Sequence, residues 1–258
     1  MSEVKNIQIP FTIFRYTPGT DDRPRTETFT VNVHPGMTVL DGLNQIKSET
    51  DATLAWRYSC RMGVCGSCGM LINGRAMLAC NTQILDISRS AIALAPLPNF
   101  PVIRDLVPDL DSMLEKHRAL KPWIIRETEV IGENLDRAYY QSPEQLEAYL
   151  QFSYCIKCGC CMAACPTMAT DTNYLGPQPL AQAYRYEADT RDEGFKERKP
   201  VLDQDSGLYS CHYGSECSVV CPKGVDPAKA IQLMKRQMVL DLIRMRRKKP
   251  AQLCSDNK

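Results

Sequence analysis

The sequence predicts an α+β protein with a β-rich N-terminal domain, residues 1–105, followed by an all-helical domain, residues 106–258. Three observations predict this. Two runs rich in β-branched and aromatic residues open the chain, a loop of closely spaced cysteines follows, and two further cysteine runs lie among segments of helical periodicity. Pro96, Pro98 and Pro101 mark the boundary between the domains. A chain of 258 residues is long enough for two modest cores.

The first predicted elements are a β-hairpin and a helix. Residues 7–16 and 26–33 have strand composition, and a polar turn over residues 18–22 joins them. Thr38 is a predicted N-cap residue. The apolar residues after it share one helical face: Val39, Leu40, Leu43 and Ile46.

A cysteine loop follows this helix. Cys60, Cys65 and Cys68 have the C-x4-C-x2-C spacing of a plant-type [2Fe–2S] site, and Cys80 supplies a distant fourth thiolate. Three glycines in the loop allow the backbone to wrap closely around a cluster: Gly63, Gly66 and Gly69. A zinc site or a redox dithiol is the alternative for these cysteines.

Residues 70–72 and 75–78 flank Asn73-Gly74, which predicts a type I′ hairpin that returns Cys80 to the loop. Strand pair, helix, cysteine loop and second hairpin in this order predict a β-grasp fold of the plant-type ferredoxin kind.

The helical domain contains two matched cysteine runs. Residues 155–166 read C-x2-C-x2-C-x3-C-P, the spacing of bacterial two-cluster ferredoxins, in which the fourth cysteine binds the other cluster. Residues 211–222 repeat the frame with Gly214 at the second cysteine position. This crossing predicts a [4Fe–4S] site at Cys155, Cys158, Cys161 and Cys221. It predicts a [3Fe–4S] site at Cys165, Cys211 and Cys217.

Structural zinc and disulfides are the alternatives to clusters in this domain. Zinc sites come as two cysteine pairs, without the ferredoxin spacing or the proline after the last cysteine. The cysteines are clustered rather than spread as cross-links, and no signal peptide precedes them, so disulfides are not expected. Two cysteines are surplus. Cys160 is predicted to be a small buried hydrophobic residue, and Cys254 lies in the C-terminal tail.

Four helices are predicted around these runs. The first spans residues 109–119, with His117 on its solvated side. A polar surface stretch, residues 127–141, leads to a capping box at residues 142–145 that starts the helix before Cys155. The third helix spans residues 177–188.

Asp226-Pro227 begins the final helix. Its apolar stripe is predicted to be core: Ile231, Met234, Met238, Leu242 and Met245. Residues 223–249 are basic, which predicts a solvated face or a surface for anionic lipid or an acidic partner.

Composition excludes several function classes. The net charge of +1 gives no indication of nucleic-acid binding. No run of about eighteen apolar residues predicts a membrane span. The N-terminus lacks the character of a transit peptide, so we expect a prokaryotic chain at the cytoplasmic face of the inner membrane. Three clusters without an identifiable catalytic acid, base or nucleophile predict an electron relay.

The motifs resemble those of the iron–sulfur subunits of succinate:quinone oxidoreductases, the succinate dehydrogenase and fumarate reductase family. The resemblance covers nearly the whole chain and is carried by residues 59–69, 73–74, 78–80, 152–156, 165–166, 174–177 and 221–227. It implies a flavoprotein subunit that holds FAD and the dicarboxylate site. It also implies membrane anchor subunits that share a quinone, menaquinone or ubiquinone, with this chain.

The [3Fe–4S] end is expected to face the quinone. Because Cys165 and Cys211 are assigned to that cluster, the residues after them, Pro166, Thr167 and His212, are expected beside it. The resemblance adds Lys235 on the last helix. His212 and Lys235 are candidate hydrogen-bond or proton donors to the quinone, or else structural partners of the cluster and of a lipid phosphate.

Residues 167–170 depart from many succinate dehydrogenases, which have an aromatic pair with a quinone-site tryptophan there. This segment resembles fumarate reductases more, whereas Cys211-His212 resembles the dehydrogenases, so the direction of turnover stays open with a lean to a low-potential quinone. Two other functions use similar clusters: the electron-transfer subunit of a soluble fumarate reductase or glycolate oxidase, and a free ferredoxin-like carrier. The former have further cysteine-rich segments, and the latter binds no flavoprotein tightly.

Overall fold

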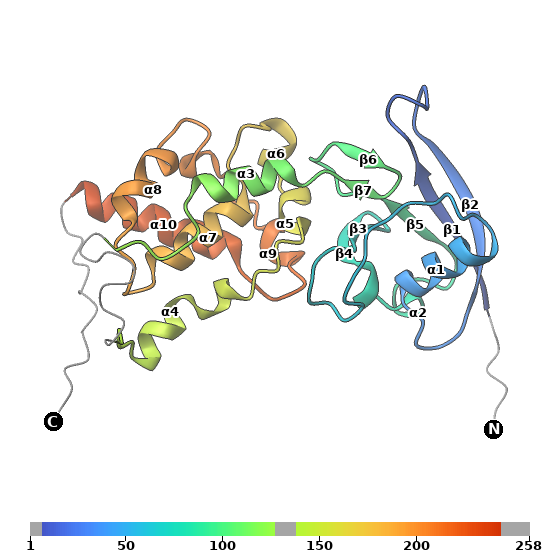
Figure 1. Cartoon of the computed structure of the whole chain (residues 1–258), viewed down its shortest axis with the longest axis horizontal. Helices are drawn as coiled ribbons and strands as arrows, with labels where there is room; N and C mark the ends of the chain where they lie inside the picture. Colours follow the sequence, from blue (N-terminus) through green and yellow to red (C-terminus); the bar gives the residue numbers. More distant parts are fainter. Residues whose placement is uncertain (1–6, 127–137, 244–258) are drawn as a thin grey trace.

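The computed structural model describes residues 7–126 and 138–243 (Figure 1). The β-rich and helical parts lie end to end, with a short hairpin between them (Figure 1). This arrangement confirms the predicted α+β class. Among the described residues, no helix combines the length and the apolar character that a membrane crossing requires.

The N-terminal part is a five-stranded mixed sheet with the strand order β2-β1-β5-β3-β4. The predicted first hairpin is confirmed: β1 (Ile7–Arg15) pairs antiparallel with β2 (Arg25–Val33), with Phe11 opposite Phe29. β5 (Ile92–Ala95) joins β1 in parallel, which brings the chain back into the middle of the sheet.

Helix α1 (Val39–Glu49) begins at a capping box in which Thr38 and Asp41 satisfy each other's backbone N–H groups. Its predicted apolar face is buried. The second predicted hairpin is also confirmed, as β3 (Gly69–Ile72) and β4 (Arg75–Leu78). Asn73 and Gly74 both have positive φ, 47° and 79°, as a type I′ turn requires.

The hairpin between the two parts was not predicted. It consists of β6 (Val102–Arg104) and β7 (Val107–Pro108). Asp105 N–H donates to the carbonyl of Tyr16, 2.7 Å, and Leu106 N–H to that of Ala55, 3.2 Å, so the turn of this hairpin is bound to the N-terminal sheet. The predicted boundary at residues 105 and 106 falls in that turn and stays a prediction.

The helical part surrounds α7 (Pro177–Glu187), which packs against α3 (Asp111–Ala119), α4 (Pro143–Ser153) and α10 (Pro227–Leu242). These are the four predicted helices. The predicted surface stretch, residues 127–141, lies mostly outside the described residues. Shorter helices complete this part: α5 (Cys160–Ala163), α6 (Pro166–Thr170), α8 (Phe195–Leu202) and α9 (Glu216–Val219). Three other short helices lie at Ala79–Asn81, Ile84–Ile87 and Leu208–Ser210.

Two predictions about single residues were wrong. His117 was expected on a solvated face but is only 8% exposed, because the side of α3 that carries Met113 and His117 is buried. Leu242 was expected in the core but is 65% exposed, because the buried stripe of α10 ends at Met238. Met245 and Cys254 lie outside the described residues.

A buried arginine ties the helices together. The guanidinium of Arg198, on α8, donates to Glu187 (2.7 Å) and to both oxygens of Asp192 (2.7 and 3.0 Å), and all three side chains are fully buried. Arg198 also donates to the carbonyls of Leu120 and Trp123, at 3.0 and 2.7 Å. The chain after α3 is thereby held against the loop between α7 and α8.

We expect Arg198→Met to destabilise the protein by about 3–5 kcal/mol, because it leaves two buried carboxylates without their cation. Lys121→Met is the matched control, since it breaks an exposed ion pair with Glu197 and should cost less than about 1 kcal/mol. Urea unfolding of the anaerobically purified chain, followed by far-ultraviolet circular dichroism, measures both. Equal losses in the two variants would contradict the importance of the buried network.

Candidate iron–sulfur cluster sites

Backbone amides converge on sulfurs in the loop after α1. Cys60 Sγ accepts hydrogen bonds from the N–H groups of Met62 (3.5 Å), Val64 (3.3 Å) and Cys65 (3.3 Å). Gly63 N–H donates to Cys80 Sγ at 3.3 Å. These donors lower the pKa of Cys60 to about 6, with the bond from Met62 as the largest cause. The loop is therefore built to hold a thiolate, as a cluster ligand must be.

Cys68 completes this group from the buried side. Its Sγ accepts a hydrogen bond from Cys80 N–H at 3.5 Å, and burial raises its pKa to about 12. A bound cation is what would keep such a sulfur ionised. Cys65, by contrast, is exposed. The group thus has one face toward the sheet and one toward solvent, and it fits a [2Fe–2S] cluster.

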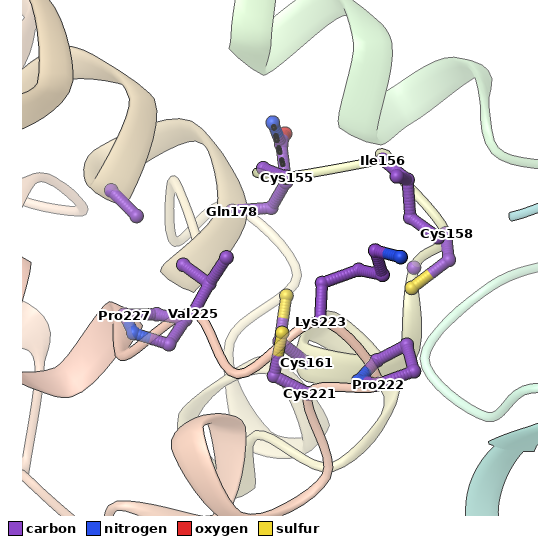
Figure 2. A pocket seen from close by; sticks show the side chains of 12 residues that line it. Cys155, Ile156, Cys158, Cys161, Gln178, Cys221, Pro222, Lys223, Val225 and Pro227 are labelled. Atoms are coloured by element: carbon purple, nitrogen blue, oxygen red, sulfur yellow. Dashed lines mark hydrogen bonds between the residues drawn. The ribbon is translucent and has the colours of Figure 1, made fainter. Parts of the chain in front are cut away.

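Cysteines from both runs of the helical part surround one cavity (Figure 2). Cys155 follows α4, Cys161 lies on α5, and Cys221 follows α9. The cavity is lined by Cys155, Cys158, Cys161 and Cys221, together with Gln178 and Lys223. The structure therefore brings together the four residues predicted for the [4Fe–4S] cluster, and they remain its predicted ligands.

A second cavity is lined by the three remaining predicted ligands of the runs, Cys165, Cys211 and Cys217. Gly214 also lines it, at the position where the frame lacks a cysteine. Its φ is not positive, and a Cβ there would lie 3.3 Å from Pro166 Cγ. Seven of the predicted ligands thus divide into four and three, as a [4Fe–4S] and a [3Fe–4S] cluster need.

Among the described residues, no three His, Cys, Asp or Glu side chains form a group that could hold one metal ion. Thiolates on one zinc ion lie about 2.3 Å from the same metal, whereas the thiolates around a cluster bind different irons.

The two parts of the chain touch at their cysteine loops. A Cβ on Gly66 would lie 2.9 Å from Cys158 Cβ and 2.9 Å from the carbonyl oxygen of Ile156. The missing side chain of Gly66 therefore leaves room for the Cys158 loop, and it also allows the turn its positive φ of 76°. Gly69, predicted only to wrap a cluster, also faces this loop, since its Cβ would lie 3.0 Å from the carbonyl oxygen of Cys158.

Asn99 fastens this contact and was missed by sequence reasoning. Its Nδ2 donates to the carbonyls of Met162 (2.9 Å) and Ala163 (3.1 Å), which end α5. The residue has a positive φ of 67°. Its place among the boundary prolines is the one signal in the sequence, because asparagine tolerates this backbone conformation at turns.

The predicted quinone residues are only partly brought together. Pro166 and Thr167 line the three-cysteine cavity. Lys235 Nζ donates to the carbonyl oxygen of Cys211 at 3.0 Å, beside the cavity but not in its lining. His212 is exposed and does not line the cavity.

Two buried donors beside the cysteines had no assigned role. Tyr174 is 1% exposed, lines the three-cysteine cavity and forms a side-chain hydrogen bond with Cys211. Cys160 is fully buried, as predicted, but its thiol also hydrogen-bonds Cys158, and this bond is the main cause that lowers the pKa of Cys158 to about 7. The signal that could identify each residue is a neighbouring ligand cysteine. For Cys160 this neighbour is adjacent in the sequence, and for Tyr174 it is adjacent only in the fold.

Two family models match the chain in agreement with this geometry. Residues 10–115 match a 2Fe-2S iron-sulfur cluster binding domain, and residues 151–225 match a 4Fe-4S dicluster domain. These matches assign the β-rich part to the first type of cluster and the helical part to a pair of clusters.

Whole-chain relatives are close. A fumarate reductase iron-sulfur subunit of Mycobacterium tuberculosis is 44% identical over 88% of this chain and 92% of its own length. A succinate dehydrogenase iron-sulfur subunit of Paracoccus denitrificans is 41% identical over 89% of this chain and 87% of its own. A chain of the Mycobacterium smegmatis Sdh1 complex in the apo form superposes with a TM-score of 0.81 and 26% identity, covering 92% of this chain and 98% of that one. The protein therefore belongs to the family of iron–sulfur electron-transfer subunits of fumarate reductase and succinate dehydrogenase.

Proposed function

We propose that this chain connects the FAD of a flavoprotein subunit to a quinone held with membrane anchor subunits, as a peripheral subunit at the cytoplasmic face of the inner membrane. The observation that supports this most is the arrangement of its cysteines. The loop that carries Cys60 to Cys80 contacts the loop of Cys158. Each of the other two cavities is lined by cysteines from both runs. When bound, the three clusters supply one-electron redox chemistry.

The proposed ligands are the cysteines already described. The [2Fe–2S] cluster is held by Cys60, Cys65, Cys68 and Cys80, and the [4Fe–4S] cluster by Cys155, Cys158, Cys161 and Cys221. The [3Fe–4S] cluster is held by Cys165, Cys211 and Cys217. Amide, hydroxyl and thiol donors around these sulfurs stabilise negative charge.

The surface of the first loop supports a docking role. Met62 and Val64 are 72% and 54% exposed, next to the exposed Cys65. The Arg61 guanidinium lies 5.2 Å from the centre of the Tyr58 ring, at the edge of the same loop. Exposed apolar side chains next to a redox site favour a protein partner over solvent, and we assign this surface to the flavoprotein.

At the other end, we assign the quinone to the surface of the three-cysteine cavity formed by Pro166 and Thr167. Lys235 holds the Cys211 carbonyl there, and His212 is exposed beside it. The quinone is menaquinone or ubiquinone. Because similarity extends to both fumarate reductases and succinate dehydrogenases, the proposal includes turnover in either direction.

Gly214→Cys should convert the three-cysteine site into a four-cysteine site. The backbone allows a side chain, and the ring of Pro166 needs to move by only a few tenths of an ångström. We expect iron content to rise from about nine to about ten atoms per chain, and the potential of this cluster to fall because a thiolate adds negative charge. Iron analysis and EPR of the anaerobically purified complex measure both.

Gly214→Ala is the control, since it adds the same Cβ without a ligand and should leave the signal of the oxidised three-iron cluster in place. An unchanged three-iron signal in a folded Gly214→Cys complex would contradict the proposed ligand frame.

The quinone assignment is tested by kinetics of the assembled complex. His212→Ala or Lys235→Ala should slow quinone turnover by about 10²-fold, the usual scale for losing a proton donor, while electron transfer to an artificial acceptor persists. Lys229→Ala removes an exposed lysine from α10, the helix that carries Lys235, and should change neither activity. Loss of both activities together with the three-iron EPR signal would show that the two residues support the cluster instead.

A further inference from the structure

Gln178 is a buried amide beside the four-cysteine cavity. It lies in the first turn of α7, is 1% exposed and lines the cavity. Its Nε2 lies 4.0 Å from Cys155 Sγ and 3.4 Å from His117 Nδ1 (Figure 2 shows the contact with Cys155). Its Oε1 is buried and has no hydrogen-bond partner among the residues that the structure describes. Only the nitrogen side of this amide therefore has contacts that fix its orientation.

The neighbour that fixes the orientation is His117. The two hydrogens of an amide NH2 group can point to two acceptors, here Nδ1 of a neutral imidazole and a cysteine sulfur. Burial, followed by the charge of Lys157, lowers the pKa of His117 to about 4, so its imidazole is neutral near pH 7, and Nδ1 accepts from the amide in the tautomer that carries its proton on Nε2. In that tautomer, an amide turned around would place its carbonyl oxygen against both Nδ1 and the sulfur, with no proton between the three acceptors.

We propose that Gln178 donates a hydrogen bond to Cys155 that raises the potential of the cluster in the four-cysteine cavity, and that His117 is the positioning residue that keeps the NH2 group aimed at the sulfur. The inference rests on the proposed assignment of Cys155 to the [4Fe–4S] cluster.

The sign follows from charge. Reduction adds a negative charge to the cluster and its sulfurs, and a donor to a ligand sulfur stabilises the more negative state. Removing the donor therefore makes reduction less favourable. No charged group is involved, so the donor raises the potential without adding a titrating side chain in contact with the sulfur.

The test is a redox titration of the assembled, anaerobically purified complex, followed by low-temperature EPR. Gln178→Met keeps the length and the apolar packing of the side chain but removes the donor. We expect the equilibrium constant for one-electron reduction of the [4Fe–4S] cluster to fall up to about tenfold, which corresponds to a fall in midpoint potential of about 59 mV. The potentials of the other two clusters should not change.

Gln182→Met is the matched control. Gln182 lies one turn further along α7, is 8% exposed, and its Nε2 donates at 2.8 Å to the carbonyl of Phe152 rather than to a sulfur. This variant should leave the [4Fe–4S] potential unchanged. Equal shifts in the two variants would overturn the proposal, because they would show a general effect of the helix.

Substitution of His117 tests the positioning role separately. His117→Leu should lower the potential in the same direction as Gln178→Met, and His117→Asn should restore it, because the Asn oxygen can accept where Nδ1 does. A potential unchanged by His117→Leu would overturn the role of His117. An unchanged potential in Gln178→Met with an intact signal would overturn the role of Gln178, whereas a shift in another cluster's signal would show that the assignment of Cys155 is wrong.

Discussion

The structure depends on how it stabilises cysteine sulfurs that are shielded from water. A thiolate in a buried site is unfavourable unless donors or a cation stabilise it. In the N-terminal loop, the backbone supplies the donors: the amides of residues 62–65 close around Cys60 and Cys80. In the helical part, side chains do so. Tyr174, Gln178 and Cys160 each lie against a different cysteine, and each is almost wholly buried.

The second constraint is the contact between the two parts of the chain. Gly66 faces the Cys158 loop at a distance that leaves no room for a side chain, and Asn99 binds the carbonyls at the end of α5. Backbone groups and one amide thus form part of this contact, beside the apolar side chains of Leu97 and Phe100 that lie against Gly159. Helix α7 connects the two cavities of the helical part, because Pro177 lines the three-cysteine cavity and Gln178 lines the four-cysteine cavity.

Much of the fold could be predicted because its signals are local. Thr38, Asn73-Gly74, Ser142 and Asp226 each determine a cap or turn within a few residues, and all are found as predicted. The grouping of the cysteines followed from spacing alone. His117 could not be placed, because its burial depends on α7, about sixty residues away in the sequence. The contacts of Gly66 and Asn99 were missed for the same reason, since each joins two domains.

The exchange of cysteines between the two runs has a consequence for biosynthesis. The cysteines of the N-terminal loop have all been synthesised once residue 80 has been added, and the last strand of their sheet follows soon after, ending at Ala95. Neither cavity of the helical part can close at that stage, since one needs Cys221 and the other needs Cys211 and Cys217. The order of the residues therefore sets the earliest point at which each cluster site can form. The helical part must be nearly fully synthesised before either of its clusters has a place to be inserted.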